Sequence, residues 1–217
     1  EVQLVSRLGV DPERCIHTHP IKRDKDIRNA LHAGVRVFVA DNPEEVRKFR
    51  RHRQHAELLL RVSFRSPGAV SDLSRKFGCD PEAAMDLARL AARLGIPVRG
   101  FSFHVGSQAP DALKHVEAIE ACTALLRQAR REKLGRYDAL DTGGGFPIHY
   151  AKRVPDIVRF CAPIRKALTA VPKNVRVIAE PGRYIVGPCA LSVASVMGRA
   201  EREGLWWYYL DDGLYGS

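Results

Sequence analysis

The sequence has no long apolar run and no paired cysteines, and these absences exclude several classes of protein. No stretch reaches the roughly 18 consecutive apolar residues of a membrane span, and the first residues lack the pattern of a secretory signal. The five cysteines are widely spaced, without a CxxC pair for metal or redox chemistry. His17 and His19 have no acid or cysteine at a matching spacing, so they predict no metal site. We expect a cytoplasmic protein with reduced thiols.

Low-complexity tracts and linkers are also absent, which predicts a single domain. The 217 residues are 45% hydrophobic and 28% charged, enough for a sizeable core. The net charge of +10 does not predict nucleic-acid binding, because Lys and Arg are spread over nearly every polar segment and do not gather beside aromatic residues. The densest basic cluster, residues 47–53, falls within an expected helix and is interpreted as its solvated face. A basic surface also suits small anionic ligands.

Short β-branched runs alternate with longer amphipathic stretches along the whole chain, a pattern typical of an α/β fold with parallel strands. A doubly wound sheet would carry its phosphate-binding turn after the first strand, where nothing resembles GxGxxG. Here polar motifs follow several successive strands, and a (β/α)8 TIM-type barrel would gather them at one face. The barrel is therefore favoured. The expected strands are 14–17, 35–40, 57–64, 98–105, 139–142, 175–179 and 206–211, and the expected helices are 24–33, 43–51, 81–94, 112–133 and 155–170.

The two ends of the sequence predict an incomplete barrel. Residues 1–5 have the pattern of the middle of an amphipathic helix, and a barrel would need at least one strand before them. Residues 211–217 form a glycine-rich turn directly after the last expected strand. We interpret residues 1–205 as a truncated barrel and residues 206–217 as the start of a connection to a C-terminal β domain that this sequence lacks.

An acid and a base, Glu180 and Arg183, lie three residues apart after the expected strand 175–179, which we expect to be buried. A fixed carboxylate stabilises a protonated nitrogen heterocycle, and a guanidinium binds phosphate oxygens through two hydrogen bonds. Gly182 is expected to allow a sharp turn between the two side chains. The simpler alternative is a salt bridge between Glu180 and Arg183.

Two further motifs follow earlier expected strands. Gly143, Gly144 and Gly145 offer a run of backbone N–H groups without side chains in the way, which favours phosphate binding over an ordinary strand-to-helix turn. His104 alone would more often be a hydrogen-bonded core histidine. With Ser107 close by, however, the imidazole could stack on an aromatic ring while the serine hydroxyl contacts a phosphate.

Four motifs together, FHVGSQ, DTGGGFP, EPGRYIV and DDGLYGS, resemble in order and spacing the fold type III pyridoxal-phosphate decarboxylases. That family includes ornithine, lysine, arginine and diaminopimelate decarboxylases, and segments 20–30 and 73–78 resemble its ornithine branch. The resemblance implies a pyridoxal-phosphate cofactor whose ring stacks on His104 and whose pyridine nitrogen pairs with Glu180. The implied catalytic residues are His104, Glu180 and Tyr215, and the implied cofactor-binding residues are Arg61, His104, Ser107, Gly143, Gly144, Gly145, Glu180, Arg183 and Tyr215.

The resemblance also implies decarboxylation of a basic amino acid, first of all L-ornithine to putrescine and CO2 for polyamine synthesis. It implies a homodimer with shared active sites. The spread of Lys and Arg and the lack of a long apolar run predict no nucleic-acid or membrane partner. Diaminopimelate decarboxylation, a non-catalytic homologue that acts as a binding protein, and a small carrier barrel without a β domain are the alternatives.

The sequence departs from this family at two points. The lysine that carries the cofactor on the family's first strand and the cysteine that a partner subunit donates are both not found. Lys22 and Lys76 fall in other motifs, so neither is assigned the role of the cofactor lysine. We therefore expect the chain alone to be inactive.

Overall fold

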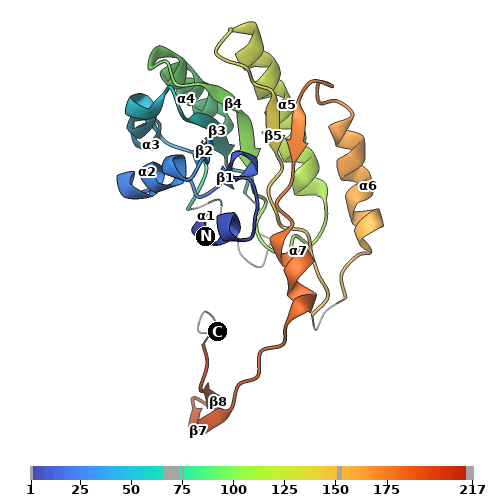
Figure 1. Cartoon of the computed structure of the whole chain (residues 1–217). Helices are drawn as coiled ribbons and strands as arrows, with labels where there is room; N and C mark the ends of the chain where they lie inside the picture. Colours follow the sequence, from blue (N-terminus) through green and yellow to red (C-terminus); the bar gives the residue numbers. More distant parts are fainter. Residues whose placement is uncertain (1, 66–73, 75, 151–152, 214–217) are drawn as a thin grey trace.

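Six parallel strands, hydrogen-bonded in chain order, form the curved sheet at the centre of the computed structural model (Figure 1). The structure describes residues 2–65, 74, 76–150 and 153–213. Each strand pairs with its sequence neighbour, as in a barrel opened along one side, whereas a doubly wound sheet reverses its strand order. The barrel prediction is confirmed, in the form of a half-barrel. The strands are β1 (Ile16–His17), β2 (Val37–Ala40), β3 (Glu57–Val62), β4 (Val98–Phe103), β5 (Ala139–Asp141) and β6 (Arg176–Ile178).

The helices between consecutive strands cover the convex face of the sheet (Figure 1). Two of them begin at side chains that accept hydrogen bonds from the first turn: Asn42 from the N–H of Glu45 at 3.0 Å, and Asp156 from the N–H of Val158 at 2.9 Å. No helix in the described part of the chain is long and apolar enough to cross a membrane. The helices are α1 (Val2–Arg7), α2 (Asp24–His32), α3 (Pro43–Lys48), α4 (Pro81–Arg93), α5 (Leu113–Arg131), α6 (Ile157–Leu168) and α7 (Gly182–Val186).

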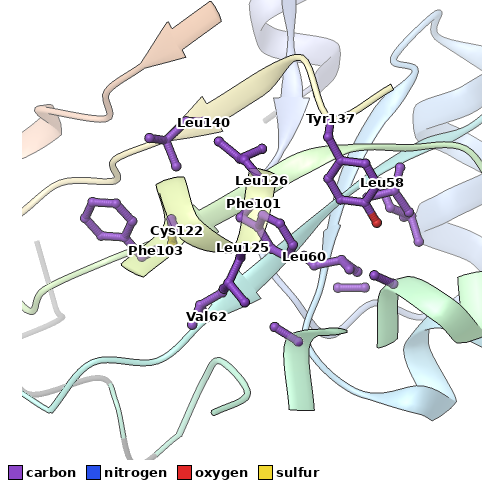
Figure 2. Packing of buried hydrophobic residues seen from close by; sticks show 14 of the residues in the cluster. Leu58, Leu60, Val62, Phe101, Phe103, Cys122, Leu125, Leu126, Tyr137 and Leu140 are labelled. Atoms are coloured by element: carbon purple, nitrogen blue, oxygen red, sulfur yellow. The ribbon is translucent and has the colours of Figure 1, made fainter. Parts of the chain in front are cut away.

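Side chains on each strand alternate between the helix-covered face and the inner face of the half-barrel. On β3, Leu58, Leu60 and Val62 belong to the main core, which they share with residues of the helices. Leu59 belongs to a small inner cluster, and the same alternation places Arg61 on the inner face. Figure 2 shows the main core where α5 crosses β3, β4 and β5. The outer face therefore supplies packing, and the inner face is left for polar side chains.

The seventh expected strand does not join the parallel sheet. It forms β8 (Leu205–Leu210), which pairs antiparallel with β7 (Val196–Arg202) in a separate two-stranded sheet. Glu203 and Gly204 connect the two strands with φ angles of 54° and 74°, as a tight two-residue hairpin requires. Three of the seven residues of β7 are charged, so the sequence pattern did not predict this strand.

The expectation that residues 175–179 are buried is wrong for most of this segment. Val175 is buried, but Val177 is 41% exposed. The reason is that β6 lies at the edge of the sheet, and within the described chain only β5 pairs with it. An apolar run predicts a strand, but whether both of its faces are covered depends on its neighbours.

Candidate active site

The carboxyl ends of parallel strands lie at one edge of the sheet and carry the polar motifs. Arg61 lies on β3, His104 follows β4, the glycine segment 143–145 follows β5 and Glu180 follows β6. Arg61, His104 and Glu180 line one open cavity of about 1410 Å³, together with Phe77 and with residues of α1, β1 and α2. The half-barrel therefore brings two of the three motifs, with His104 and Glu180, to one cavity. The glycine segment is not among the described residues that line this cavity, but it lies against His104 and Glu180.

The backbone at the end of β4 and in the loop after it lies close against the first and last residues of the glycine segment 143–145. A Cβ atom on Gly143 would overlap the carbonyl oxygen of Phe103, and one on Gly145 would overlap the carbonyl oxygen of Gly106. The φ angles of Gly143 and Gly145 are 63° and 100°, in the left-handed region that favours glycine. Close approach and backbone conformation thus both require glycine at these positions.

Gly144 lies where the other two motifs meet. A Cβ atom on Gly144 would lie 2.7 Å from the carbonyl oxygen of Glu180 and 3.0 Å from Nε2 of His104. The N–H of Gly143 donates to Oδ1 of Asp141 at 2.9 Å and is therefore already used. The N–H groups of Gly144 and Gly145 have no acceptor among the described residues. Two of the three expected phosphate-binding amides are thus unpaired within the described chain.

The guanidinium of Arg183, on α7, donates hydrogen bonds to two hydroxyl groups from loops. Its Nε donates to Oγ of Ser107 at 2.9 Å, and its Nη1 donates to the hydroxyl of Tyr150 at 3.0 Å. The same guanidinium lies over the Tyr150 ring, 5.9 Å from its centroid. The alternative salt bridge to Glu180 does not form. The sequence did not single out Tyr150, because it lies in a loop without a motif of its own.

The sharp turn after Glu180 is made at Pro181. The φ and ψ angles of Pro181 are −77° and 43°, and the N–H of Gly182 donates across it to the carbonyl oxygen of Glu180 at 2.8 Å. A Cβ atom on Gly182 would meet nothing within 4 Å, and its φ lies outside the left-handed region. The expectation that Gly182 is needed for the turn is therefore wrong.

His104 is held as a neutral ring. Its Nδ1 accepts a hydrogen bond from the N–H of Gly106 at 3.0 Å, so Nε2 carries the proton. Burial, the positive charge of Arg61 and the nearby His115 lower the pKa of His104 to about 4. A flat, neutral imidazole fixed on one edge is suited to stacking on another ring.

A second acid, Asp141, lies at the end of β5 and was not singled out in the sequence. Its side chain is fully buried, and Oδ2 has no hydrogen-bond partner among the described residues. Burial and the negative charge of Glu180 raise the pKa of Asp141 to about 7, against the opposing effects of the Gly143 N–H and Arg61. Burial lowers the pKa of Arg61, while Glu180, Asp41 and Asp141 oppose that effect. The inner face thus holds two acids around one guanidinium.

Lys22 has a structural role in the described chain. Its fully buried Nζ donates to the carbonyl oxygens of His19, Pro20 and Val39 at 3.0, 2.8 and 2.5 Å, and lies 3.5 Å from the carboxylate of Glu45. An amine with all three donors occupied holds the β1–α2 connection and is not available as a nucleophile. Tyr215 lies outside the described residues.

These features define a half-barrel with an anion cradle beside a fixed imidazole and a carboxylate. The chain belongs to the pyridoxal-dependent decarboxylases, since the family model of their pyridoxal-binding domain matches residues 1–187. It is 35% identical over 218 residues to the lysine/ornithine decarboxylase of Selenomonas ruminantium, covering 100% of this chain and 55% of that protein. It is 36% identical over 235 residues to the ornithine decarboxylase of Caenorhabditis elegans, covering 100% of this chain and 54% of that protein.

Solved structures agree with this assignment. Two crystal structures of the lysine/ornithine decarboxylase of Vibrio vulnificus, complexed with putrescine and with cadaverine, are 50% identical to this chain, with TM-scores of 0.84 and 0.85. They match 100% of this chain and 57% and 56% of their own chains. The chain thus spans about half the length of the relatives that it matches.

Proposed function

We propose that this chain provides the cofactor-binding barrel of a pyridoxal-phosphate-dependent decarboxylase that acts on a basic amino acid. One observation carries the proposal: Ser107, from the loop after β4, and Arg183, from α7, meet beside a glycine segment with two unpaired N–H groups. A cation, a hydroxyl and free amides that no Cβ obstructs are what a phosphate group requires. The residues present therefore fit the phosphate of this cofactor.

The same site fits the ring of the cofactor. When bound, pyridoxal phosphate supplies an electron-accepting ring that stabilises the carbanion left when the substrate carboxylate departs as CO2. Within the chain, His104 offers a neutral stacking surface, and the carboxylate of Glu180 favours a protonated pyridine nitrogen. Arg61 lies among these acids, and Glu180, Asp41 and Asp141 favour its charged form against the effect of burial. Tyr215 is proposed to lie near cofactor and substrate.

L-Ornithine, decarboxylated to putrescine, is the proposed substrate, and L-lysine, decarboxylated to cadaverine, is the second candidate. Support for ornithine is the similarity to ornithine and lysine/ornithine decarboxylases over the whole of this chain. Support for lysine is the 50% identity to the Vibrio vulnificus enzyme, which was solved with cadaverine as well as with putrescine. Diaminopimelate is kept as a third substrate to be tested.

The assembly and the location are proposed on the family resemblance. We propose a homodimer with shared active sites. The sequence placed the end of the barrel at residue 205, but β7 pairs with β8 outside the barrel sheet, so we propose that the connection to a further β domain begins at β7. The five cysteines are free, which supports a reducing compartment such as the cytoplasm.

The test is an assay of the full-length natural protein that carries this sequence, purified with pyridoxal phosphate. CO2 release and amine product are measured with L-ornithine, L-lysine and meso-diaminopimelate, and we expect kcat/KM to be highest for ornithine. The chain of 217 residues, assayed in parallel, is expected to bind the cofactor weakly and to remain inactive. Cofactor binding without turnover of any of these substrates would support the non-catalytic homologue, and failure to bind the cofactor would overturn the proposal.

A further inference from the structure

A buried histidine that the sequence did not single out lies behind the glycine segment. His115 is in the first turn of α5, is 0% exposed, and has its Nε2 3.1 Å from the carbonyl oxygen of Gly144. The rings of Phe103, Phe146 and Phe160 surround it, with centroids 6.5, 5.2 and 5.7 Å away. His115 is thus a polar ring in an aromatic cage with a single polar contact.

Packing alone does not explain a histidine at this place. The carbonyl of Gly144 can only accept, so Nε2 of His115 carries the proton and Nδ1 does not. Nδ1 has no partner among the described residues. Burial lowers the pKa of His115, against the opposing hydrogen bond with Gly144, so the ring is neutral at pH 7. An unpaired buried nitrogen costs free energy that a phenylalanine of similar shape would avoid.

The hydrogen bond from His115 fixes a peptide group that belongs to the anion cradle. The carbonyl of Gly144 and the N–H of Gly145 are parts of one planar trans peptide, and they point in opposite directions. Since the carbonyl points to α5, the N–H of Gly145 points away from α5, and it has no acceptor among the described residues. Glycines on both sides would let this peptide rotate if nothing held the carbonyl.

We propose that His115 is a positioning residue of the phosphate cradle. By donating to the carbonyl of Gly144, it holds the N–H of Gly145 in the orientation that binds a phosphate oxygen. The same hydrogen bond polarises the peptide and strengthens that N–H as a donor. The inference rests on the proposed function, since the phosphate is that of pyridoxal phosphate.

The test compares two ligands that differ only in the phosphate. In His115→Phe, the aromatic volume is kept and the donor is lost. Dissociation constants of pyridoxal phosphate and of pyridoxal are measured by fluorescence titration of the full-length natural apoprotein. We expect His115→Phe to raise the dissociation constant of pyridoxal phosphate about tenfold, as for one lost hydrogen bond to a charged group. The dissociation constant of pyridoxal should stay unchanged.

Two further variants separate positioning from packing. His115→Gln places an amide N–H near the position of Nε2 and is expected to recover most of the phosphate-dependent affinity. Thr123→Val, on the same helix, removes a buried hydroxyl that donates to the carbonyl of Ile119 at 2.6 Å and does not contact the cradle. Thr123→Val is expected to leave both dissociation constants unchanged.

The possible outcomes are distinct. Suppose that the wild type binds pyridoxal phosphate, and that His115→Phe loses affinity equally for both ligands or loses none for either. His115 would then have a merely structural role, and its assignment would be overturned. A wild type that does not bind the cofactor would overturn the proposed function as well. If His115→Phe does not fold, His115→Met, which fills the cage without a donor, serves for the same comparison.

Discussion

Nε of Arg183 lies 2.9 Å from Oγ of Ser107, although the two residues are 76 positions apart in the sequence. Ser107 follows β4 and Arg183 lies on α7 after β6, so the two side chains meet across the end of β5, where the glycine segment begins. This contact joins a cation from a helix and a hydroxyl from a loop at one point. An anion placed there would receive charge, hydroxyl and amide contacts together.

Replacing Arg183 with alanine should weaken pyridoxal-phosphate binding about tenfold or more, because a charge-assisted contact to the phosphate is lost. Arg183→Lys should recover only part of this affinity, since an ammonium group cannot make two parallel hydrogen bonds. Fluorescence titration of the apoprotein measures both. Tyr150→Phe, which removes the 3.0 Å hydrogen bond but keeps the guanidinium, is the matched control and should have a small effect. Unchanged affinity in Arg183→Ala would place the phosphate elsewhere.

Replacing Glu180 with glutamine or alanine should lower kcat of the full-length protein by roughly 100- to 1000-fold, with little change in KM. The reason is that the carboxylate acts on charge that develops as CO2 leaves, and single electrostatic groups of this kind have effects of about that size. Steady-state kinetics with ornithine and lysine provide the measurement. Glu120→Gln, an exposed acid on α5, is the control. A kcat like that of the wild type in Glu180→Gln would remove Glu180 from the electrostatic role.

Asp141→Asn should become more stabilising, relative to wild type, as the pH rises from 5 to 8. The pKa of Asp141 is raised to about 7 in the folded state, mainly by burial, so its contribution to stability is present at low pH and is lost as the pH rises through 7. Asparagine does not titrate, so the unfolding free energy of Asp141→Asn should rise relative to that of the wild type by about 2 kcal/mol between pH 5 and 8.

Urea denaturation at several pH values tests this prediction, and the lowered histidine pKa values cancel because both proteins contain them. Asp138→Asn is the control. Burial raises the pKa of Asp138, but hydrogen bonds from Arg99 and Arg136 outweigh burial and lower this pKa. The effect of Asp138→Asn should therefore be destabilising and constant between pH 5 and 8. A difference for Asp141→Asn that is also constant with pH would contradict the raised pKa.

Gly143→Ala should destabilise the fold by about 2 kcal/mol or more and abolish cofactor binding, because the new Cβ overlaps the carbonyl oxygen of Phe103 at a residue with φ of 63°. Gly182→Ala is the matched control, since its Cβ meets nothing within 4 Å, and it should change stability by less than about 0.5 kcal/mol. Thermal and urea unfolding provide the comparison. Equal stabilities of the two variants would show that the crowding at Gly143 is relieved without cost.

The half-barrel could be predicted because strand and helix periodicity are local. The expected strand at 57–64 and helix at 81–94 correspond to β3 and α4 within two residues at each end. The antiparallel partner of the last strand could not be predicted, because β7 carries three charged residues among seven, and its pairing depends on a strand that comes later in the chain. The exposure of Val177 is likewise a property of the sheet edge and not of the strand sequence.

The sequence by itself determined the class of site: His104, Glu180 and the glycine segment are visible as chemistry at the ends of apolar runs. Only the tertiary structure showed that Asp141 lies buried beside Glu180 with a raised pKa, and that His115 donates to Gly144 from 29 positions away. Residue type and spacing along the chain are local quantities. Burial, charge neighbours and the direction of a peptide group are set by which distant segments pack together, and a single sequence does not contain those distances.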